Sequence, residues 1–274
     1  MKKSGYVNGD DGKLWYEIVG DGDTLVMVHA GFVDSRMWDD QWDAFTAGYR
    51  VIRFDQRGFG KSDPAQGPVS RRRDLLRVLD GLEVEHAPLL GCSMGGEVVM
   101  DVALEHPERV SALIVASATP SGFELQGAPP RYVMEMMEAA QKGDLERTSD
   151  LQIRIWVDGP SREPEQVDSS VRRRAAEMNR IPVQHRTFFI ADGQPIDPLD
   201  PPASTRLKEI AVPTLIIAGA LDDPEILRSA DLMASEIKGA QKVIIPNSAH
   251  LQNMENPQLF NEAVLSFLDG LKRS

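Results

Sequence analysis

The sequence has only one cysteine, Cys92, among its 274 residues. One cysteine can form neither an internal disulfide framework nor a cysteine-based zinc site. Long hydrophobic runs are also lacking: the longest covers residues 214–220, far short of the roughly 20 residues that a membrane-spanning helix needs. The start MKKSGYVNGDDG has two lysines with no apolar stretch behind them, so we expect no signal peptide. These absences favour a cytoplasmic protein that does not act at a membrane.

Basic residues are outnumbered by acidic ones. The chain has 30 lysines and arginines against 42 aspartates and glutamates, which gives a net charge of -12. Such a surface repels nucleic-acid phosphates and anionic lipids, so neither is expected as a partner. Two arginine triplets, at 71–73 and 172–174, are better explained as solvated helix faces balanced by nearby acids than as anion sites.

Short apolar runs alternate with longer helical patterns along most of the chain. Strands are expected at 5–7, 14–19, 24–29, 50–54, 87–91, 112–116, 214–218 and 242–246, and helices at about 37–46, 70–82, 94–105, 225–237 and 257–272. Most of the strand runs are continuously apolar, as expected when helices cover both faces of a sheet. The pattern predicts an α/β fold with a mostly parallel, eight-stranded sheet flanked by helices.

Residues 121–205 interrupt this alternation. Segments rich in proline and glycine lie near both ends, at 120–130 and 195–202, and helical patterns between them span 132–142, 145–156 and 166–178. We expect a helical cap at 121–205, inserted between two parts of one core at 1–120 and 206–274. Trp156 and Phe189 in this cap are candidates for an apolar substrate pocket, although such residues more often only pack.

Residues 91–95 match the pattern G-x-S-x-G between an expected strand and an expected helix. A nucleophile on such a sharp turn adopts a strained backbone, so its neighbours must be small, as Gly91 and Gly95 are. The turn exposes the hydroxyl group, and the helix points the positive end of its dipole toward it. Ser93 is therefore the candidate nucleophile, and Cys92 is expected to pack at the end of the strand.

Ser93 is expected where a parallel strand ends, at the carboxyl edge of the sheet. A histidine that acts as its base must therefore come from another loop that follows a strand. His250 lies in such a loop, between the last expected strand and the last expected helix. The acid that orients the imidazole is expected after the preceding strand, where Asp222 and Asp223 come just before Pro224. Pro224 suits the first position of a helix, which makes Asp223 the N-cap and leaves Asp222 for the site.

Together these motifs resemble one family. The order Ser93, Asp222, His250 is that of the α/β-hydrolases. Residues 55–62 are similar to the family turn D-x-R-G-x-G-x-S, and residues 105–110 and 250–257 also match family patterns. The chain therefore resembles an α/β-hydrolase with a helical cap, closest to small esterases, lactonases and enol-lactonase-like enzymes. The sharp turn that carries the nucleophile is called the elbow in this family. Serine at the elbow argues against haloalkane dehalogenases and epoxide hydrolases, which carry aspartate there.

The resemblance also implies an oxyanion hole. Residues 29–32, His-Ala-Gly-Phe, follow a strand and are similar to the family's HG loop, with one residue inserted. Gly31 best matches the residue that donates its backbone N–H, Phe32 is the alternative, and Met94 supplies the second N–H. Phe32 is also a candidate for the substrate pocket, whereas His29 is expected to support the loop.

The resemblance implies that Ser93 attacks the carbonyl carbon of a small-molecule ester or lactone and forms an acyl-enzyme, with no metal and no cofactor. A C–C bond hydrolase acting on a β-diketone-like substrate and a cofactor-free perhydrolase use the same triad and stay open as alternatives. A ligand receptor that keeps the triad with little turnover is a rival from a different class. The substrate and the oligomeric state are not indicated by the sequence.

Overall fold

An eight-stranded sheet forms the centre of the computed structural model, which describes residues 2–193 and 196–272. The strand order is β1-β2-β4-β3-β5-β6-β7-β8. The strands are β1 (Lys3–Gly9), β2 (Gly12–Val19), β3 (Thr24–Val28), β4 (Arg50–Phe54), β5 (Ala87–Cys92), β6 (Val110–Ala116), β7 (Thr214–Gly219) and β8 (Gln241–Ile245). β2 pairs antiparallel with β1 and β4, and all other pairs are parallel. The predicted mostly parallel, eight-stranded sheet is confirmed.

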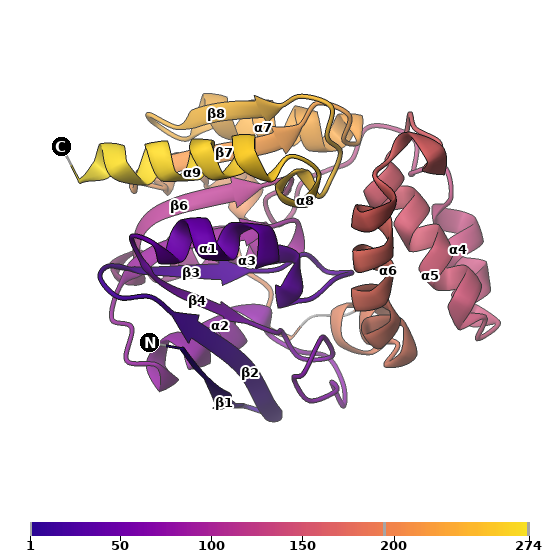
Figure 1. Cartoon of the computed structure of the whole chain (residues 1–274), viewed down its shortest axis with the longest axis horizontal. Helices are drawn as coiled ribbons and strands as arrows, with labels where there is room; N and C mark the ends of the chain where they lie inside the picture. Colours follow the sequence, from indigo (N-terminus) through magenta and orange to yellow (C-terminus); the bar gives the residue numbers. More distant parts are fainter. Residues whose placement is uncertain (1, 194–195, 273–274) are drawn as a thin grey trace.

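Helices cover both faces of this sheet (Figure 1). One face packs against α2 (Arg71–Gly81), α3 (Met94–Glu105) and α7 (Pro224–Glu236), and the other against α1 (Asp39–Thr46) and α9 (Pro257–Leu271). Each face has its own hydrophobic cluster, so the central strands are buried on both sides. This double burial explains why their sequences are continuously apolar.

Between β6 and β7 the described residues form helices: α4 (Val133–Gln141), α5 (Leu145–Ile153), the π-helical turn η3 (Arg154–Asp158), α6 (Ser169–Gln184) and the π-helical turn η5 (Phe188–Asp192). Figure 1 shows α4, α5 and α6 together at one end of the sheet. α6 was expected to end at 178, but it continues past Pro182, a residue that normally ends a helix because it lacks an N–H. Pro195, the expected start of the second proline-rich segment, lies outside the described residues.

The short helix α8 (Gln252–Glu255) was not predicted. Four residues are too few to show a helical period, so the sequence carries no signal for it. The following helix α9 begins as expected, since the Asn256 side chain accepts a hydrogen bond from the Leu259 amide at 3.4 Å.

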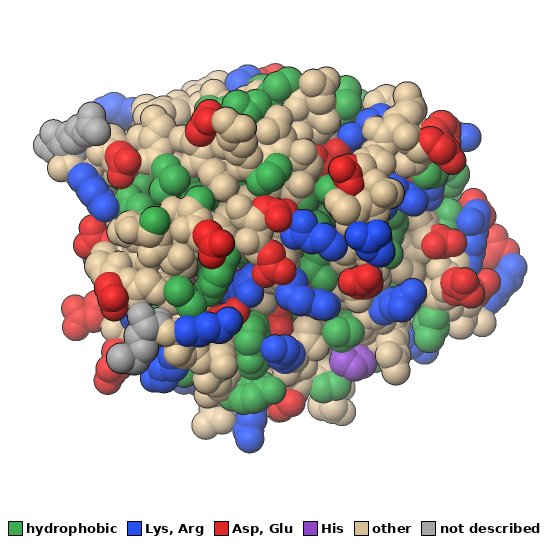
Figure 2. All heavy atoms as spheres, viewed as in Figure 1, with side chains coloured by type: hydrophobic (Ala, Val, Ile, Leu, Met, Phe, Trp, Pro, Cys, Tyr) green, Lys and Arg blue, Asp and Glu red, His purple; other side chains and the backbone are tan. Residues whose placement is uncertain are grey.

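The first arginine triplet departs from the expectation of a solvated helix face. The Arg71 and Arg72 side chains are only 7% exposed and pair at 2.9 Å with Asp192 and Glu105, respectively. Asp192 is far away in the sequence, so this burial could not be read from local pattern. As predicted, acidic side chains balance the charges of Arg71 and Arg72. Figure 2 shows basic and acidic side chains interspersed on the face drawn. None of the described helices is long and apolar enough to cross a membrane.

Candidate active site

Ser93 occupies the sharp turn between β5 and α3. Its backbone has φ 54° and ψ -120°, a conformation that residues other than glycine rarely adopt. The turn is crowded: a Cβ atom on Gly91 would lie 2.1 Å from the Gly95 carbonyl oxygen, and one on Gly95 would lie 2.4 Å from that of Val28. The two glycines therefore let β5, α3 and β3 approach closely enough to hold the strained serine in place.

Asp222 and His250 lie against each other in the loops after β7 and β8. Both carboxylate oxygens of Asp222 are 3.1 Å from Nδ1 of His250, and the two side chains are 3% and 2% exposed. The neighbouring Asp223 has another role, because its Oδ1 accepts the Glu225 amide at 2.8 Å and caps α7. Water is thus nearly excluded from the Asp222–His250 pair, and the carboxylate holds the imidazole through Nδ1.

The outer face of His250 is covered by aromatic rings. The ring centroid of Trp156 lies 5.0 Å from that of His250, and the ring of Phe32 lies 6.2 Å from it. His250 Nε2 is buried and makes no hydrogen bond within the described residues, including none to Ser93. The structure therefore brings together Asp222 and His250, with Phe32 and Trp156 against His250, whereas no hydrogen bond joins Ser93 to the imidazole.

The two residues expected to form the oxyanion hole are neighbours. A Cβ atom on Gly31 would lie 3.2 Å from Sδ of Met94, so the loop after β3 runs directly beside the first residue of α3. Phe32 follows in the same loop, and its carbonyl oxygen accepts a hydrogen bond from Asn179 of α6 at 2.8 Å. The loop is thus fixed by the core on one side and by α6 on the other.

His29 supports this loop from beneath. Its ring is fully buried, with Nδ1 2.8 Å from the Ala30 carbonyl oxygen and Nε2 2.9 Å from the Gln56 amide nitrogen. Burial lowers the pKa of His29 to about 4. A neutral imidazole donates from Nδ1–H and accepts at Nε2. His29 therefore connects the loop after β3 to the turn that begins at Asp55.

The turn at 55–62 is held by its first and last residues. Asp55 accepts the amide hydrogens of Ser35 at 2.9 Å and of Lys61 at 2.8 Å, and the Ser62 hydroxyl donates to the Asp55 carbonyl at 2.5 Å. A Cβ atom on Gly60, whose φ is +50°, would overlap the Asp55 carboxylate. The contacts of Asp55, Gly60 and Ser62 therefore stabilise a turn.

Cys92 is a buried residue at the end of β5 with no place in the exposed turn. Its Sγ lies 3.9 Å from the His250 carbonyl oxygen, and burial raises the pKa of the thiol far above its usual range. Because the thiolate is the reactive form, this cysteine is a poor nucleophile. Across the described residues, no three His, Cys, Asp or Glu side chains gather as a set of metal ligands.

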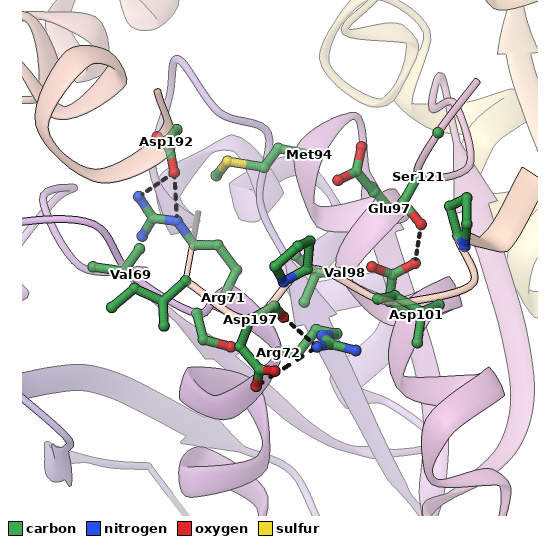
Figure 3. A pocket seen from close by; sticks show the side chains of 16 residues that line it. Val69, Arg71, Arg72, Met94, Glu97, Val98, Asp101, Ser121, Asp192 and Asp197 are labelled. Carbon is green, nitrogen blue, oxygen red and sulfur yellow. Dashed lines mark hydrogen bonds and ion pairs between the residues drawn. The ribbon is translucent and has the colours of Figure 1, made fainter. Parts of the chain in front are cut away.

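A cavity of about 350 Å³ lies beside the elbow, on the side of α2 and α3 (Figure 3). Met94 and Glu97 of α3 line it, together with Arg71 and Asp192. Within the described chain the Glu97 carboxylate has no hydrogen-bond or ion-pair partner, and none is drawn for it in Figure 3. Burial, and secondarily the nearby charge of Asp101, raises the pKa of Glu97 to about 7. Sequence analysis missed this residue, since nothing marks a glutamate in the first turn of a helix as part of a cavity wall.

Phe189 lines a different and much smaller cavity. This space of about 20 Å³ holds little more than one water molecule, and its wall includes Gly31, Gln152, Pro182 and Phe189. The three residues expected in the pocket therefore separate: Phe32 and Trp156 contact His250, while Phe189 lies near the loop after β3.

Comparisons with known proteins identify the family of this chain. A model of the alpha/beta hydrolase fold family matches residues 23–257. A relative from Azorhizobium caulinodans, provisionally named as the carbamate hydrolase RutD, is 31% identical over 96% of this chain and 97% of its own length. The 2-hydroxy-6-oxononadienedioate/2-hydroxy-6-oxononatrienedioate hydrolase of Comamonas testosteroni is 28% identical, over 91% of this chain and 88% of its own. The solved structure of Est816, described as an N-acyl homoserine lactone degrading enzyme, superimposes with a TM-score of 0.79 at 27% identity, over 96% of this chain and 100% of that one.

Proposed function

Because the chain belongs to the α/β-hydrolase family, we propose that it is a serine hydrolase that cleaves a carboxylic ester or lactone through an acyl-enzyme intermediate. The observation that carries the proposal is the buried Asp222–His250 pair, in loops beside the strained turn of Ser93. The similarity to a lactone-degrading enzyme supports the substrate class.

Ser93 Oγ attacks the carbonyl carbon while His250 Nε2 takes the hydroxyl proton, and His250 then passes this proton to the leaving alcohol. Asp222 holds the imidazole in the required tautomer and stabilises it when it is charged. The amides of Gly31 and Met94 donate hydrogen bonds to the developing oxyanion, with Phe32 as the alternative to Gly31. A water molecule activated by His250 then releases the acid.

The bond between Ser93 and His250 has to form on the way to reaction. Nε2 has no other partner to give up, so it is free to accept from a serine hydroxyl that rotates toward it. Catalytic hydrogen bonds are often long or unformed before substrate binds. The residues 121–205 would act as a cap domain that moves to admit substrate, because the rings of Trp156 and Phe32 cover the imidazole in this conformation.

A fluorophosphonate probe tests the nucleophile. We expect the label on Ser93 by peptide mass spectrometry, and Ser93→Ala should lower kcat for p-nitrophenyl acetate by roughly 10⁴- to 10⁶-fold with the fold intact. Cys92→Ala is the matched control at the same turn and should keep both labelling and activity. Labelling of another residue, or activity retained in Ser93→Ala, would show that the assignment is wrong.

Two other functions of the same site have distinct outcomes. The similarity to the Comamonas hydrolase favours a C–C bond hydrolase as the second candidate, and faster turnover of a vinylogous β-diketone than of any ester would establish it. A perhydrolase would need hydrogen peroxide as co-substrate. A receptor would release one burst of nitrophenol and stop. On the sequence grounds of a single cysteine, we also propose that the protein works in the cytoplasm.

A further inference from the structure

The chain segment after α5 packs against both loops that carry the Asp222–His250 pair. The ring of Trp156 covers His250, as described above. Three residues later, Gly159 has φ +76°, and a Cβ atom there would lie 3.0 Å from the Leu221 carbonyl oxygen and 3.1 Å from the Ala249 side chain. Leu221 and Ala249 directly precede Asp222 and His250. This segment of 121–205 therefore touches the backbone that aims each of the two side chains.

Arg162 ties this segment to α8. Its Nη1 lies 2.6 Å from Glu255 Oε2, and it also donates from Nε to the Asp158 carbonyl at 2.9 Å and from Nη2 to the Val157 carbonyl at 2.8 Å. The other oxygen of Glu255 accepts the Ala249 amide at 2.8 Å. One continuous series of hydrogen bonds thus runs from the turn that carries Trp156 to the residue before His250.

This connection lies out of water. The side chains of Arg162 and Glu255 are 9% and 6% exposed. A buried ion pair is costly to form, and removal of one partner leaves an uncompensated charge. The Arg162–Glu255 pair is therefore better suited to holding the segment and α8 in one relative position than to raising the free energy of unfolding.

We propose that Arg162 and Glu255 are positioning residues, which hold the loop before His250 and thereby fix the orientation of the imidazole. The inference rests on the catalytic roles proposed above. It assigns neither residue a contact with the substrate: both act through the Ala249 amide.

The charges around Glu255 agree with this role. Burial raises the pKa of Glu255, and the nearby Asp222 carboxylate raises it further, whereas the hydrogen bond and charge of Arg162 lower it. Without Arg162, Glu255 either takes up a proton or remains as a second anion close to the Asp222–His250 pair. Loss of the arginine therefore changes the electrostatics of the pair as well as its support.

Arg174 provides a matched control. It also joins the helical segment to the core, through an ion pair with Asp40 at 2.8 Å, and its side chain is 30% exposed. Asp40 lies on α1, and no hydrogen bond joins Asp40 or Arg174 to Ala249 or Glu255 among the described residues. Removal of this pair loosens the attachment of α6 without touching the Ala249 amide.

The experiment compares Arg162→Met with Arg174→Met in the full chain. For p-nitrophenyl acetate we expect Arg162→Met to lower kcat by roughly 10- to 100-fold with KM little changed, as when a group that orients a catalytic residue is lost. Glu255→Gln keeps an oxygen for the Ala249 amide, so its loss should be smaller. Arg174→Met should keep kcat. The second readout is the downfield proton resonance of the His250 Nδ1–H donated to Asp222, which should broaden or shift in Arg162→Met alone.

Equal losses of kcat in the two arginine variants, or an unchanged histidine resonance in Arg162→Met, would overturn the proposal. If Arg162→Met does not fold, Arg162→Lys and Glu255→Gln carry the same comparison, since each retains part of the contact. Failure of the proposed function gives a different result. If Ser93 is not the nucleophile, Ser93→Ala keeps its activity, and the histidine resonance still shows whether Arg162 positions His250.

Discussion

Replacing Glu97 with glutamine should stabilise the folded protein at alkaline pH and have little effect in acid. The carboxyl group lies in the wall of the cavity beside the elbow, with no partner among the described residues. Glutamine has nearly the same shape and no charge. The substitution therefore isolates the cost of placing a carboxylate at this position.

The magnitude follows from the pKa of Glu97, which burial and the charges of Asp101 and Asp192 raise from 4.5 to about 7. A carboxyl whose pKa is higher in the folded state favours folding below the unfolded-state pKa, and this contribution is lost as the pH rises through the folded-state pKa. The interval from 4.5 to about 7, at 1.36 kcal/mol per pH unit, gives a ceiling of about 3 kcal/mol. Because the Glu97 side chain is only partly buried and lines a cavity of about 350 Å³, we expect roughly 1–2 kcal/mol.

Urea unfolding followed by tryptophan fluorescence would measure the effect, with wild type and Glu97→Gln compared between pH 4.5 and about 8. Other groups that titrate in this range contribute to both proteins, so the difference between the two unfolding free energies is the relevant quantity. Glu177→Gln, at an exposed glutamate on α6, is the control for the same change of side chain away from the cavity. A difference for Glu97→Gln that stays flat with pH, or that favours wild type at high pH, would refute the reasoning.

The remaining predictions separate residues that the sequence places close together. Asp222→Asn should lower kcat by up to about 10⁴-fold with little change in stability, because the amide disturbs the tautomer of the imidazole. Asp223→Ala should instead cost about 1 kcal/mol of unfolding free energy, measured by urea denaturation, and keep activity, because it removes the cap of α7. Phe189→Ala should change the ratio of kcat/KM between long-chain and acetate esters, whereas Trp156→Ala should lower both values by the same factor, because its ring covers His250. The reverse pattern in either pair would mean that the roles are exchanged.

The fold was predictable from the sequence where a requirement of the backbone is met by a few neighbouring residues. The glycines around Ser93 mark the elbow because their Cβ positions are occupied by neighbouring backbone, and that requirement is visible in five residues. Likewise Pro224 distinguishes the two aspartates: the structure shows Asp223 capping α7 and Asp222 against His250. The catalytic roles of these residues remain predictions, because geometry alone does not report turnover.

The rest depends on contacts between distant parts of the chain. Trp156 and His250 are almost a hundred residues apart, and only packing of the segment after α5 onto the sheet edge brings their rings together. The Arg162–Glu255 pair is equally remote in sequence. Glu97 was missed for the same reason, since Asp192 and residues 196–199, far away in the sequence, line the same cavity. No periodicity within one helix records such contacts.

The burial of His250 sets a physical requirement on the segment that covers it. During reaction the imidazole becomes positively charged in a site that is nearly closed to water, and such a charge is tolerated only beside a fixed carboxylate. Asp222 supplies that carboxylate at 3.1 Å, and the aromatic rings of Trp156 and Phe32 keep water from competing with it. The same rings cover the imidazole that has to accept the proton of Ser93. One segment therefore controls both access to the base and the electrostatics of the charged base, so loss of the Trp156 ring should lower the turnover of small and large esters alike.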